Sequence, residues 1–389
     1  MTENVVVLGA GYAGAGAISK LQSELDDTAR LTWISDTDYH LVLHEAHRVV
    51  RDPTVRSDIT IPVHDIAEPT TQFIQDSVTN LDVDEQVVEL ADSEDVEYDY
   101  VLVGLGSGTA YYGIPGLAEH SLTLKSLDDA LEIHDRIETA SREATRGEPA
   151  QIVIGGAGLS GIQTAGEIAE FRDKHRAPLE IHLVEALDEI FPGNDPEIQQ
   201  ALRDLLEEAG VRIHTDDPIT EAEDGVIHFD EGEPLEYDVF VWTGGITGRE
   251  ALEGADLEKE HNRVNAGANF QTSDERVFAI GDSAIVDQGN QPAPPTAQAA
   301  WQAAEVAGEN ISRVIEGRPL RTWEFEDKGT VVSVGDKAVA HGVKPAFGLS
   351  MPVDTFGGRP AKNLKKLIAA RWIADLTSWN RARKCWSSL

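Results

Sequence analysis

The chain has 389 residues, of which 41% are hydrophobic, and this length is enough for two or three domains with their own cores. Its 69 acidic and 32 basic residues give a formal net charge of −37, spread over nearly the whole chain, which argues against nucleic acid as a partner. Cys385 is the only cysteine, which excludes an intramolecular disulfide and a redox-active cysteine pair.

The charge and the hydrophobic pattern also indicate where the protein works. Salt screens the repulsion between surface carboxylates, so an acidic surface of this kind suits concentrated salt, and we expect a halophilic source. The N-terminus leads directly into a predicted strand, and no signal peptide is expected. No stretch of about 18 apolar residues exists, so the sequence predicts no membrane-spanning helix.

The first predicted elements are a buried parallel strand over residues 4–8 and a crossover helix over residues 14–25. Between them lies a GxGxxG turn, whose candidate cofactor-binding residues are Gly9, Gly11, Tyr12, Ala13 and Gly14. In such a turn the first glycine permits tight folding, the second lets the backbone approach a pyrophosphate, and the third packs the helix against the strand. The pyrophosphate then lies at the positive end of the helix.

A carboxylate follows the next predicted strand, which covers residues 31–34. Asp36 lies 22 residues beyond Gly14, and a carboxylate about 20 residues beyond the last glycine binds the hydroxyls of a ribose. Further on, a strand over residues 98–103 runs into a glycine turn that contains Gly106.

A second unit repeats this plan. Its predicted elements are a strand over 151–155, a helix over 160–171 and a strand over 181–184. Its glycine turn contains Gly156, Gly158 and Gly161. Glu185 lies 24 residues after Gly161, and a carboxylate at this position would repel a 2′-phosphate, which favours NADH over NADPH. Two such units indicate two dinucleotides, and the chemistry expected between them is hydride transfer.

The later pattern contains two more strands that end in glycine turns. The predicted elements are a helix over 196–209, a strand over 211–214, an antiparallel meander around 224–232, strands over 239–242 and 277–280, and a helix over 296–314. The strand over 239–242 ends in a turn that contains Gly244, and the strand over 277–280 ends in Gly281 and Asp282.

The C-terminal residues 361–389 differ from the rest because they contain seven Lys or Arg residues and one acid. Trp372, Trp379 and Trp386 recur every seven residues, which predicts three indoles on one stripe of an amphipathic helix. Tryptophan and basic side chains suit the boundary of an anionic membrane, so we interpret this segment as a helix on a membrane surface. The alternatives are a core-facing helix and the interface of a homodimer.

The order of these motifs resembles the pyridine nucleotide-disulfide oxidoreductases, a superfamily of flavoproteins with two dinucleotide-binding domains. Within it, the chain resembles type II NADH dehydrogenases, the single-subunit NADH:quinone oxidoreductases. The segments that carry this resemblance are 113–117, 124–130, 242–245, 294–302 and 327–335. The AQxAxQ pattern at 297–302 is the most specific, and the resemblance covers residues 4–342 and continues weakly to the C-terminus.

The resemblance implies an α/β fold with two Rossmann-like domains, in which the NADH-binding domain is inserted into the FAD-binding domain. The expected boundaries are 1–115 and 265–320 for the FAD-binding domain, 116–264 for the NADH-binding domain and 321–389 for the C-terminal segment. FAD would bind to the first glycine turn, and NADH would bind as a substrate to the second.

The resemblance also implies roles for single residues. Asp282 would contact the ribityl chain of the flavin, and Lys328 would neutralise the anion formed when the flavin is reduced. Gln298 and Gln302 would line the quinone site, and Glu167 would assist nicotinamide placement or proton supply. Structural roles are the alternatives: solvated strand-end acids for Asp36 and Glu185, helix capping for Asp282, a surface lysine for Lys328, and helix packing for Gln298 and Gln302.

Three segments depart from the family pattern. The family acid that ends the second strand aligns with Ser35, so Asp36 is displaced by one position. Gln163 replaces the acid just after the second fingerprint. The segment 43–47 replaces a Pro-containing one, and its histidines share a helix-like spacing with His40. No cysteine or ordered set of acids accompanies these histidines, so no metal site is expected.

These observations predict an FAD-dependent enzyme that transfers a hydride from NADH to FAD and then two electrons to a quinone. We expect it at the cytoplasmic face of the cell membrane or in the cytoplasm. Two alternatives remain open at this point: a soluble NADH-dependent reductase of a small electron carrier, and an NADH-binding flavoprotein that senses redox state.

Overall fold

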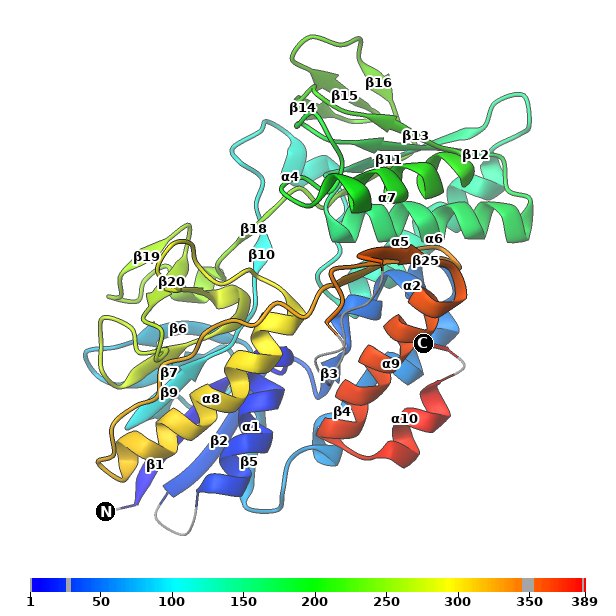
Figure 1. Cartoon of the computed structure of the whole chain (residues 1–389). Coiled ribbons are helices and arrows are strands. Elements are labelled where there is room, and N and C mark those ends of the chain that lie inside the picture. The colour runs from blue at the N-terminus through cyan, green and yellow to red at the C-terminus, as the bar shows by residue number, and fades with distance from the viewer. Residues whose placement is uncertain (1, 26–28, 345–352, 387) are drawn as a thin grey trace.

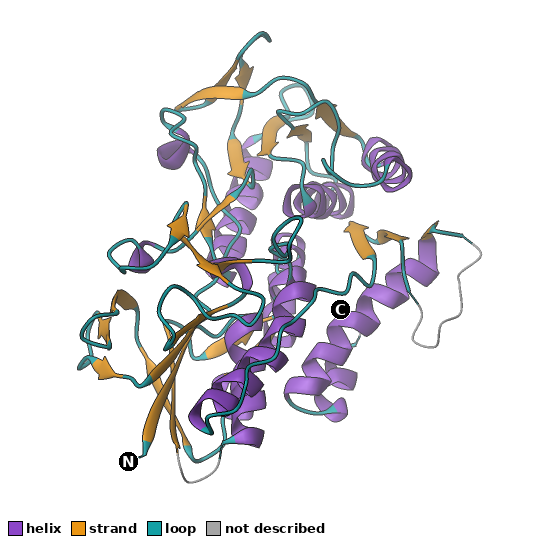
Figure 2. Cartoon of the chain, turned by 60° about the vertical axis from the view of Figure 1, so that its left-hand side comes forward, coloured by secondary structure: helices purple, strands orange, loops and turns teal. Residues whose placement is uncertain are grey.

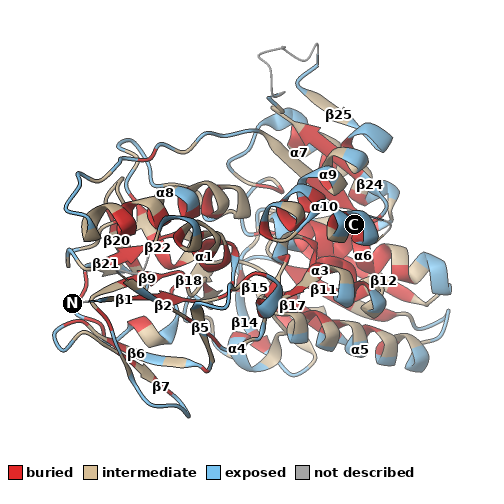
Figure 3. Ribbon diagram, turned by 90° about the horizontal axis from the view of Figure 1, so that it is seen from below, coloured by how far each residue is buried: buried red, intermediate tan, exposed pale blue. Residues whose placement is uncertain are grey.

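The computed structural model describes residues 2–25, 29–344, 353–386 and 388–389. Two lobes, each built on a parallel sheet, lie side by side, and a C-terminal segment packs beside both (Figure 1). Buried residues concentrate in the strands of the two sheets and in the helices that cover them (Figure 3).

The first sheet has five strands in the order β21-β9-β1-β2-β5, all parallel. Their bounds are Glu3–Leu8 for β1, Ala29–Ser35 for β2, Thr71–Gln75 for β5, Tyr100–Val103 for β9 and Val277–Ala279 for β21. The apolar residues of β1 are fully buried, as a parallel strand with both faces covered requires.

Two helices, α1 (Tyr12–Glu24) and α8 (Ala297–Ile315), run side by side along this sheet (Figure 2). Small residues let them approach closely, since a Cβ on Gly16 would lie 2.8 Å from the Cβ of Ala304. Because β21 joins the first sheet after the whole second lobe, the chain leaves this sheet and returns to it. This return agrees with an inserted domain, and the exact domain boundaries stay predictions.

The second sheet has four parallel strands in the order β13-β12-β11-β17. The strands are β11 (Ala150–Gly155), β12 (Leu179–Val184), β13 (Val211–His214) and β17 (Val239–Trp242). The helices of this lobe are α5 (Leu127–Glu143), α6 (Leu159–His175) and α7 (Pro196–Glu208). These bounds confirm the strands and helices expected here, to within a few residues at each end.

Each lobe also contains a small antiparallel sheet, and one two-stranded sheet connects the lobes. In the first lobe an antiparallel meander precedes β9 and consists of β6 (Val78–Asp82), β7 (Val87–Leu90) and β8 (Val96–Glu97). In the second lobe the corresponding meander precedes β17 and consists of β14 (Ile219–Glu223), β15 (Val226–Phe229) and β16 (Leu235–Glu236). Two crossing segments, β10 (Gly108–Thr109) and β18 (Ile246–Thr247), pair between the lobes.

Short elements complete the two lobes. They include β3 (Tyr39–Leu41), β4 (Thr60–Pro62), α2 (His47–Arg51), α3 (Arg56–Ile59) and α4 (Leu117–His120) in the first half of the chain, and β19 (Lys259–Glu260), β20 (Arg263–Ala266) and β22 (Ala284–Val286) in the second half. Among them, α2 contacts both α5 and α6, so it lies where the two lobes meet.

The C-terminal segment forms an antiparallel sheet and two helices. They are β23 (Thr330–Val334), β24 (Lys337–His341), β25 (Thr355–Gly357), α9 (Gly358–Leu376) and α10 (Trp379–Cys385). The strand β23 packs on α6, and α9 packs on β23 and β24. None of the helices in the described part of the chain is both long and apolar enough to cross a bilayer.

The prediction of one helix with three tryptophans on a single stripe is wrong. The helix ends at Leu376, and Ser378 starts a new one by accepting a hydrogen bond from the Arg381 backbone N–H. This break changes the direction of the chain between Trp372 and Trp379. Trp372 is buried in the core, whereas Trp379 and Trp386 are exposed. Residue 387, within the predicted 361–389, lies outside the described residues.

Candidate dinucleotide sites and a buried charged cluster

The two glycine turns have nearly the same backbone. Gly9 has a φ of +97° and Gly156 a φ of +90°, in the region that favours glycine. Gly11 and Gly158 are the N-caps of α1 and α6, with φ and ψ of −73° and −168° in the first and −75° and −169° in the second. The chain therefore builds the same strand-to-helix turn twice.

The remaining space around these turns fits a pyrophosphate. A Cβ on Gly14 would lie 1.8 Å from the Gly9 carbonyl oxygen, and one on Gly161 would lie 1.9 Å from that of Gly156, so only glycine lets the helices start here. In contrast, a Cβ on Gly11 or Gly158 would meet nothing within 4 Å. Neither helix has a side-chain N-cap, which leaves the backbone N–H groups of the first turn directed at an incoming anion.

The carboxylates after the second strand of each lobe differ in position. The registers pair Leu8 with Ile34 and Gly155 with Val184, so Ser35 and Glu185 are equivalent residues. Glu185 is buried, and its carboxylate accepts hydrogen bonds from the backbone N–H groups of Ala157 at 2.8 Å and Leu187 at 3.1 Å.

In the first lobe the carboxylate belongs to the next residue. Asp36 is exposed, and its Oδ1 accepts a 3.4 Å hydrogen bond from the hydroxyl of Ser35. Asp36 thus reaches the end of the sheet from solvent, whereas Glu185 lies directly on its glycine turn.

A polar corner closes the first sheet at its carboxyl end. Asp282 Oδ2 accepts a hydrogen bond from Ser107 Oγ at 3.1 Å, and Lys125 Nζ donates to the same hydroxyl at 3.4 Å. Burial lowers the pKa of Lys125, while Asp282 acts in the opposite direction. Gly106 has a φ of +73° and open space where a Cβ would be.

Gly281 and Gly244, which follow the strands β21 and β17, have no such open space and pack against neighbouring residues. A Cβ on Gly281 would lie 3.1 Å from the Cβ of Ala13, which places the first glycine turn beside the start of this corner. Gly244 packs under the indole of Trp242, since a Cβ there would lie 2.3 Å from the ring. Gly244 also accepts a hydrogen bond from the hydroxyl of Tyr112 through its carbonyl oxygen at 3.1 Å.

Gln298 and Gln302 bind the extended segment that precedes β23. Gln298 Oε1 accepts from the Lys328 backbone N–H at 2.7 Å, and its amide donates to the Gly329 carbonyl at 3.2 Å. Gln302 makes the same pair of contacts with the backbone of Glu326, at 3.1 and 2.9 Å. The Lys328 residue itself is exposed. Both glutamines thus position the segment that contains this lysine.

An aromatic group joins the first glycine turn to the C-terminal helix α9. Trp372 Nε1 donates to His40 Nε2 at 2.8 Å, and the ring of Trp372 packs 4.9 Å from that of Tyr12. His40 Nδ1 therefore carries the proton and donates to the Ala10 carbonyl at 2.7 Å. Burial lowers the pKa of His40 to about 4, and the pKa of His44, which hydrogen-bonds the Tyr12 hydroxyl, also to about 4. These hydrogen bonds give both histidines partners within the protein.

A buried charged cluster lies where α2, α6, β23 and α9 meet. Its members are Glu45, His47, Arg48, Gln163, Glu167, Ser333 and Lys365. Lys365 Nζ donates to Ser333 Oγ at 2.7 Å and lies 3.2 Å from His47 Nε2. Gln163 donates to the same hydroxyl at 3.2 Å. Burial lowers the pKa of Lys365 to about 8.

The acids of the cluster have opposite shifts. Burial opposes the charge of Glu45, but Lys365 and Arg48 outweigh it and lower the pKa of Glu45. Burial raises the pKa of Glu167, against the effect of Arg51, whose Nε lies 2.9 Å from Oε2 of Glu167. No oxygen of Glu167 has a hydrogen bond of good geometry to the described residues.

Sequence reasoning identified Glu167 alone from this cluster as a site residue. The others were missed because the cluster joins residues up to 318 positions apart, such as His47 and Lys365. Lys365 belongs to the basic residues that the sequence analysis assigned to a membrane-surface helix. The local signals were the helix-like spacing of His47 with His44 and the replacement of the family acid by Gln163.

Comparisons with known proteins agree with the presence of two dinucleotide-binding units. Residues 3–304 match the pattern of the pyridine nucleotide-disulphide oxidoreductase family. The type II NADH:quinone oxidoreductase of Staphylococcus saprophyticus is 30% identical over 395 aligned residues, covering 96% of both chains, and that of Staphylococcus aureus strain NCTC 8325 is 29% identical, covering 95% of both. The chain therefore belongs to the pyridine nucleotide-disulphide oxidoreductase family and, within it, to the group that contains the type II enzymes.

Solved structures agree on the fold. The structure of NDH2 from Plasmodium falciparum in complex with NADH superposes with a TM-score of 0.85 at 15% identity, covering 100% of this chain and 97% of that one. The sulfide:quinone oxidoreductase of Aquifex aeolicus gives a TM-score of 0.80 at 18% identity, covering 97% and 92%. The predicted α/β fold with two Rossmann-like units is confirmed.

Proposed function

We propose that this protein is a type II NADH:quinone oxidoreductase, with FAD as a bound cofactor and NADH as the donor. The observation that carries the proposal is the similarity to a type II NADH:quinone oxidoreductase over 96% of both chains. The two glycine turns with matching backbones support it, because each fits one pyrophosphate.

FAD is assigned to the first turn. When bound, FAD supplies the redox chemistry, which is uptake of a hydride from NADH and delivery of two electrons to a quinone. Around it, the backbone N–H groups after Gly11 would bind the pyrophosphate, and Asp36 would bind the ribose from the solvent side. The corner of Asp282, Ser107 and Lys125 would orient the ribityl chain through its hydrogen bonds.

NADH is assigned to the second turn. Gly156, Gly158 and Gly161 would hold its pyrophosphate, and Glu185 would bind the hydroxyls of its ribose. Because the Glu185 carboxylate already accepts hydrogen bonds from the turn, it is held in position before the substrate arrives. Its charge would repel a 2′-phosphate.

The quinone side is assigned to Gln298, Gln302 and the segment of Lys328. The two glutamines hold this segment against the N-terminal part of α8. Lys328 would offset negative charge near the ring, and Glu167 would supply a proton, since burial raises the pKa of its carboxyl group. The cluster around Glu167 keeps this proton away from bulk solvent.

The C-terminal segment is proposed to touch a membrane surface, with a smaller apolar patch than the sequence indicated. From the start of α9 onward, the large apolar side chains that are exposed are Leu367, Ile368, Trp379 and Trp386. Basic residues of α10 flank the two tryptophans, a combination that suits an anionic leaflet. A homodimer that uses the same patch is the alternative.

One assay tests the function. The purified protein, reconstituted with FAD in molar KCl, is mixed with NADH and a short-chain quinone, and NADH loss and quinol formation are followed together. Equal rates of the two support the proposal. If NADH reduces the flavin but no quinone accepts the electrons, while a small protein carrier does, the enzyme is a reductase of that carrier. If the protein binds NADH without turnover, it is a sensor.

A further inference from the structure

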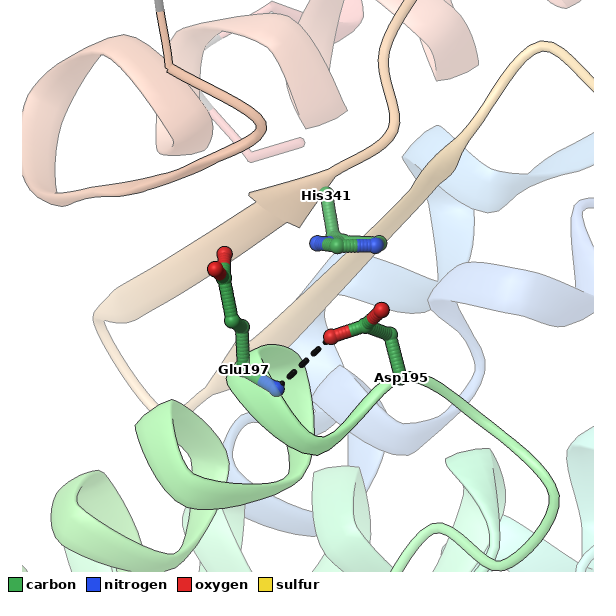
Figure 4. A group of neighbouring side chains, drawn as sticks. All are labelled: Asp195, Glu197 and His341. Carbon is green, nitrogen blue, oxygen red and sulfur yellow. Dashed lines mark hydrogen bonds between the residues drawn. The ribbon is translucent and has the colours of Figure 1, made fainter.

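Three possible metal ligands meet at a place that none of the proposed roles uses. Asp195 and Glu197 stand at the start of α7 in the second lobe, and His341 ends β24 of the C-terminal sheet and faces them (Figure 4). One ligand atom from each residue lies within 4.8 Å of the other two. The three side chains come from segments more than 140 positions apart, so tertiary packing creates the group.

The spacing of the three ligand atoms is close to the spacing found around a bound metal ion. A point equidistant from three atoms 4.8 Å apart lies about 2.8 Å from each, and zinc bonds to nitrogen and oxygen are about 2.1 Å long. A movement of about 0.7 Å by each side chain therefore reaches coordination distance. Asp195 and Glu197 are exposed and His341 is partly exposed, so solvent and not packed protein lies on one side of the group.

The histidine is held with a free ring nitrogen. Thr355 Oγ1 donates to Glu197 Oε2 at 2.9 Å, and it lies 2.6 Å from His341 Nδ1. The hydroxyl has one proton, which the carboxylate accepts, so His341 Nδ1 must be the donor to Thr355. The lone pair of the imidazole is then on Nε2. An orienting hydrogen bond to the other ring nitrogen is the usual arrangement of a metal-binding histidine.

Electrostatics favours a cation at this place. Neither carboxylate forms an ion pair with a lysine or arginine of the described residues. The N-terminus of α7 contributes about half a positive charge, and Asp195 Oδ1 accepts the Glu197 backbone N–H at 2.8 Å. Two carboxylates exceed this partial charge, and a divalent cation offsets the remainder.

We propose that Asp195, Glu197 and His341 bind a divalent transition-metal ion. One imidazole with two carboxylates suits zinc or manganese better than magnesium, which prefers oxygen ligands and keeps its waters. The ion has three protein ligands and water in its remaining positions. It joins the N-terminal end of α7 to the β24–β25 sheet, and thereby stabilises the contact between the second lobe and the C-terminal segment.

Calorimetric titration of the full-length, FAD-loaded protein with Zn²⁺ tests this site, after chelation and in molar KCl with excess Mg²⁺ to occupy the acidic surface. One tight site is expected. His341→Gln and Asp195→Asn should each weaken binding at least tenfold, and asparagine keeps the N-cap of α7. Thr355→Val should weaken it about 10- to 100-fold through the histidine.

A matched control is His228→Gln, because His228 on β15 is also partly exposed and lies near a carboxylate, that of Glu223 at 3.5 Å. It should bind Zn²⁺ like the wild type. Zinc should also raise the midpoint of thermal unfolding of the wild type and of His228→Gln, but not of His341→Gln. The proposal is overturned if Mg²⁺ abolishes zinc binding to the wild type, or if His341→Gln and His228→Gln bind alike.

Discussion

Lys365 Nζ lies 2.7 Å from Ser333 Oγ, deep between the C-terminal helix α9 and the strand β23. The lysine is 4% exposed, and Glu45 at 3.6 Å is its nearest acid. A charge so buried is costly unless its partners are complete. Lys365 Nζ also lies 3.2 Å from His47 Nε2, and this second contact connects the C-terminal segment with the interior where the lobes meet. The burial of this lysine makes the stability of the protein sensitive to pH.

Replacing Lys365 by methionine should change how stability depends on alkaline pH. Burial lowers the pKa of Lys365 from 10.5 to about 8, so between these values the unfolded chain binds a proton that the folded protein lacks. Stability from this group therefore rises from pH 8 to pH 10.5 and is constant below pH 8. The free energy of unfolding of the wild type relative to Lys365→Met should rise by up to about 3 kcal/mol across this range.

Guanidinium unfolding at several pH values measures this difference. Lys337→Met is the control, since Lys337 forms an exposed ion pair with Glu208 and should show no such rise. Parallel curves for the wild type and Lys365→Met would contradict the prediction.

Acid should weaken the wild type through His40. Burial lowers the pKa of this histidine from 6.5 to about 4, so within that window the unfolded chain binds a proton and the folded protein does not. Stability should fall as the pH drops from 6.5 to 4, by up to about 3 kcal/mol for this group. His40→Gln, which does not titrate, should lose less over the same range. If chemical unfolding shows the same acid slope for both proteins, His40 is not the responsible group.

Removing the charge of Glu185 should reduce the preference for NADH. Glu185→Gln keeps an acceptor for the Ala157 N–H but no longer repels a 2′-phosphate. The ratio of kcat/KM for NADH to that for NADPH should fall about tenfold, equivalent to roughly 1.4 kcal/mol. Glu180→Gln is the control, because Glu180 lies near the beginning of β12, at the opposite end from Glu185. A wild type that uses both coenzymes equally would refute the assignment.

Changing Gln298 and Gln302 to methionine should slow reoxidation of the flavin by quinone about tenfold and leave its reduction by NADH nearly unchanged. The reason is that both residues are assigned to the acceptor side. Rapid mixing separates the two half-reactions. Equal slowing of both would instead indicate a structural role.

Gln288→Met separates these two explanations further. Gln288 also ties this segment down, through the Phe325 N–H at 2.7 Å and the Trp323 carbonyl at 3.2 Å, but it lies away from the AQxAxQ turn of helix. It should leave quinone reduction unchanged. If it slows reoxidation as much as the double variant, loosening of the segment explains the effect.

The exposed tryptophans should carry the membrane contact. Trp379→Ala with Trp386→Ala should lower binding to anionic vesicles at least tenfold in a sedimentation assay, because each indole offers apolar surface with a polar N–H. Leu187→Ala, an equally exposed apolar residue in the second lobe, should have no effect. If the double variant binds vesicles normally but changes the oligomeric state, the patch is a subunit interface.

The sequence alone determined the two Rossmann-like units, because both signals are local. A buried β run, a glycine turn and an Ala-rich helix follow each other within about 20 residues, and the glycine positions reflect clashes within the same turn, such as that of Gly14 with Gly9. The displacement of the first carboxylate from Ser35 to Asp36 came from the resemblance to the family, and the strand registers agree with it because they make Ser35 equivalent to Glu185.

Only the tertiary structure decided the fate of the C-terminal residues and of the charged side chains. Heptad spacing put Trp372, Trp379 and Trp386 on one stripe, but the Ser378 cap starts a new helix, and Trp372 turns into the core to bond His40. The spacing described a continuous helix and contained no information on what it packs against. In the same way Lys365 was assigned to a membrane-surface helix, and Asp195 and His341 were not singled out, because packing of the lobes brings together partners that are distant in sequence.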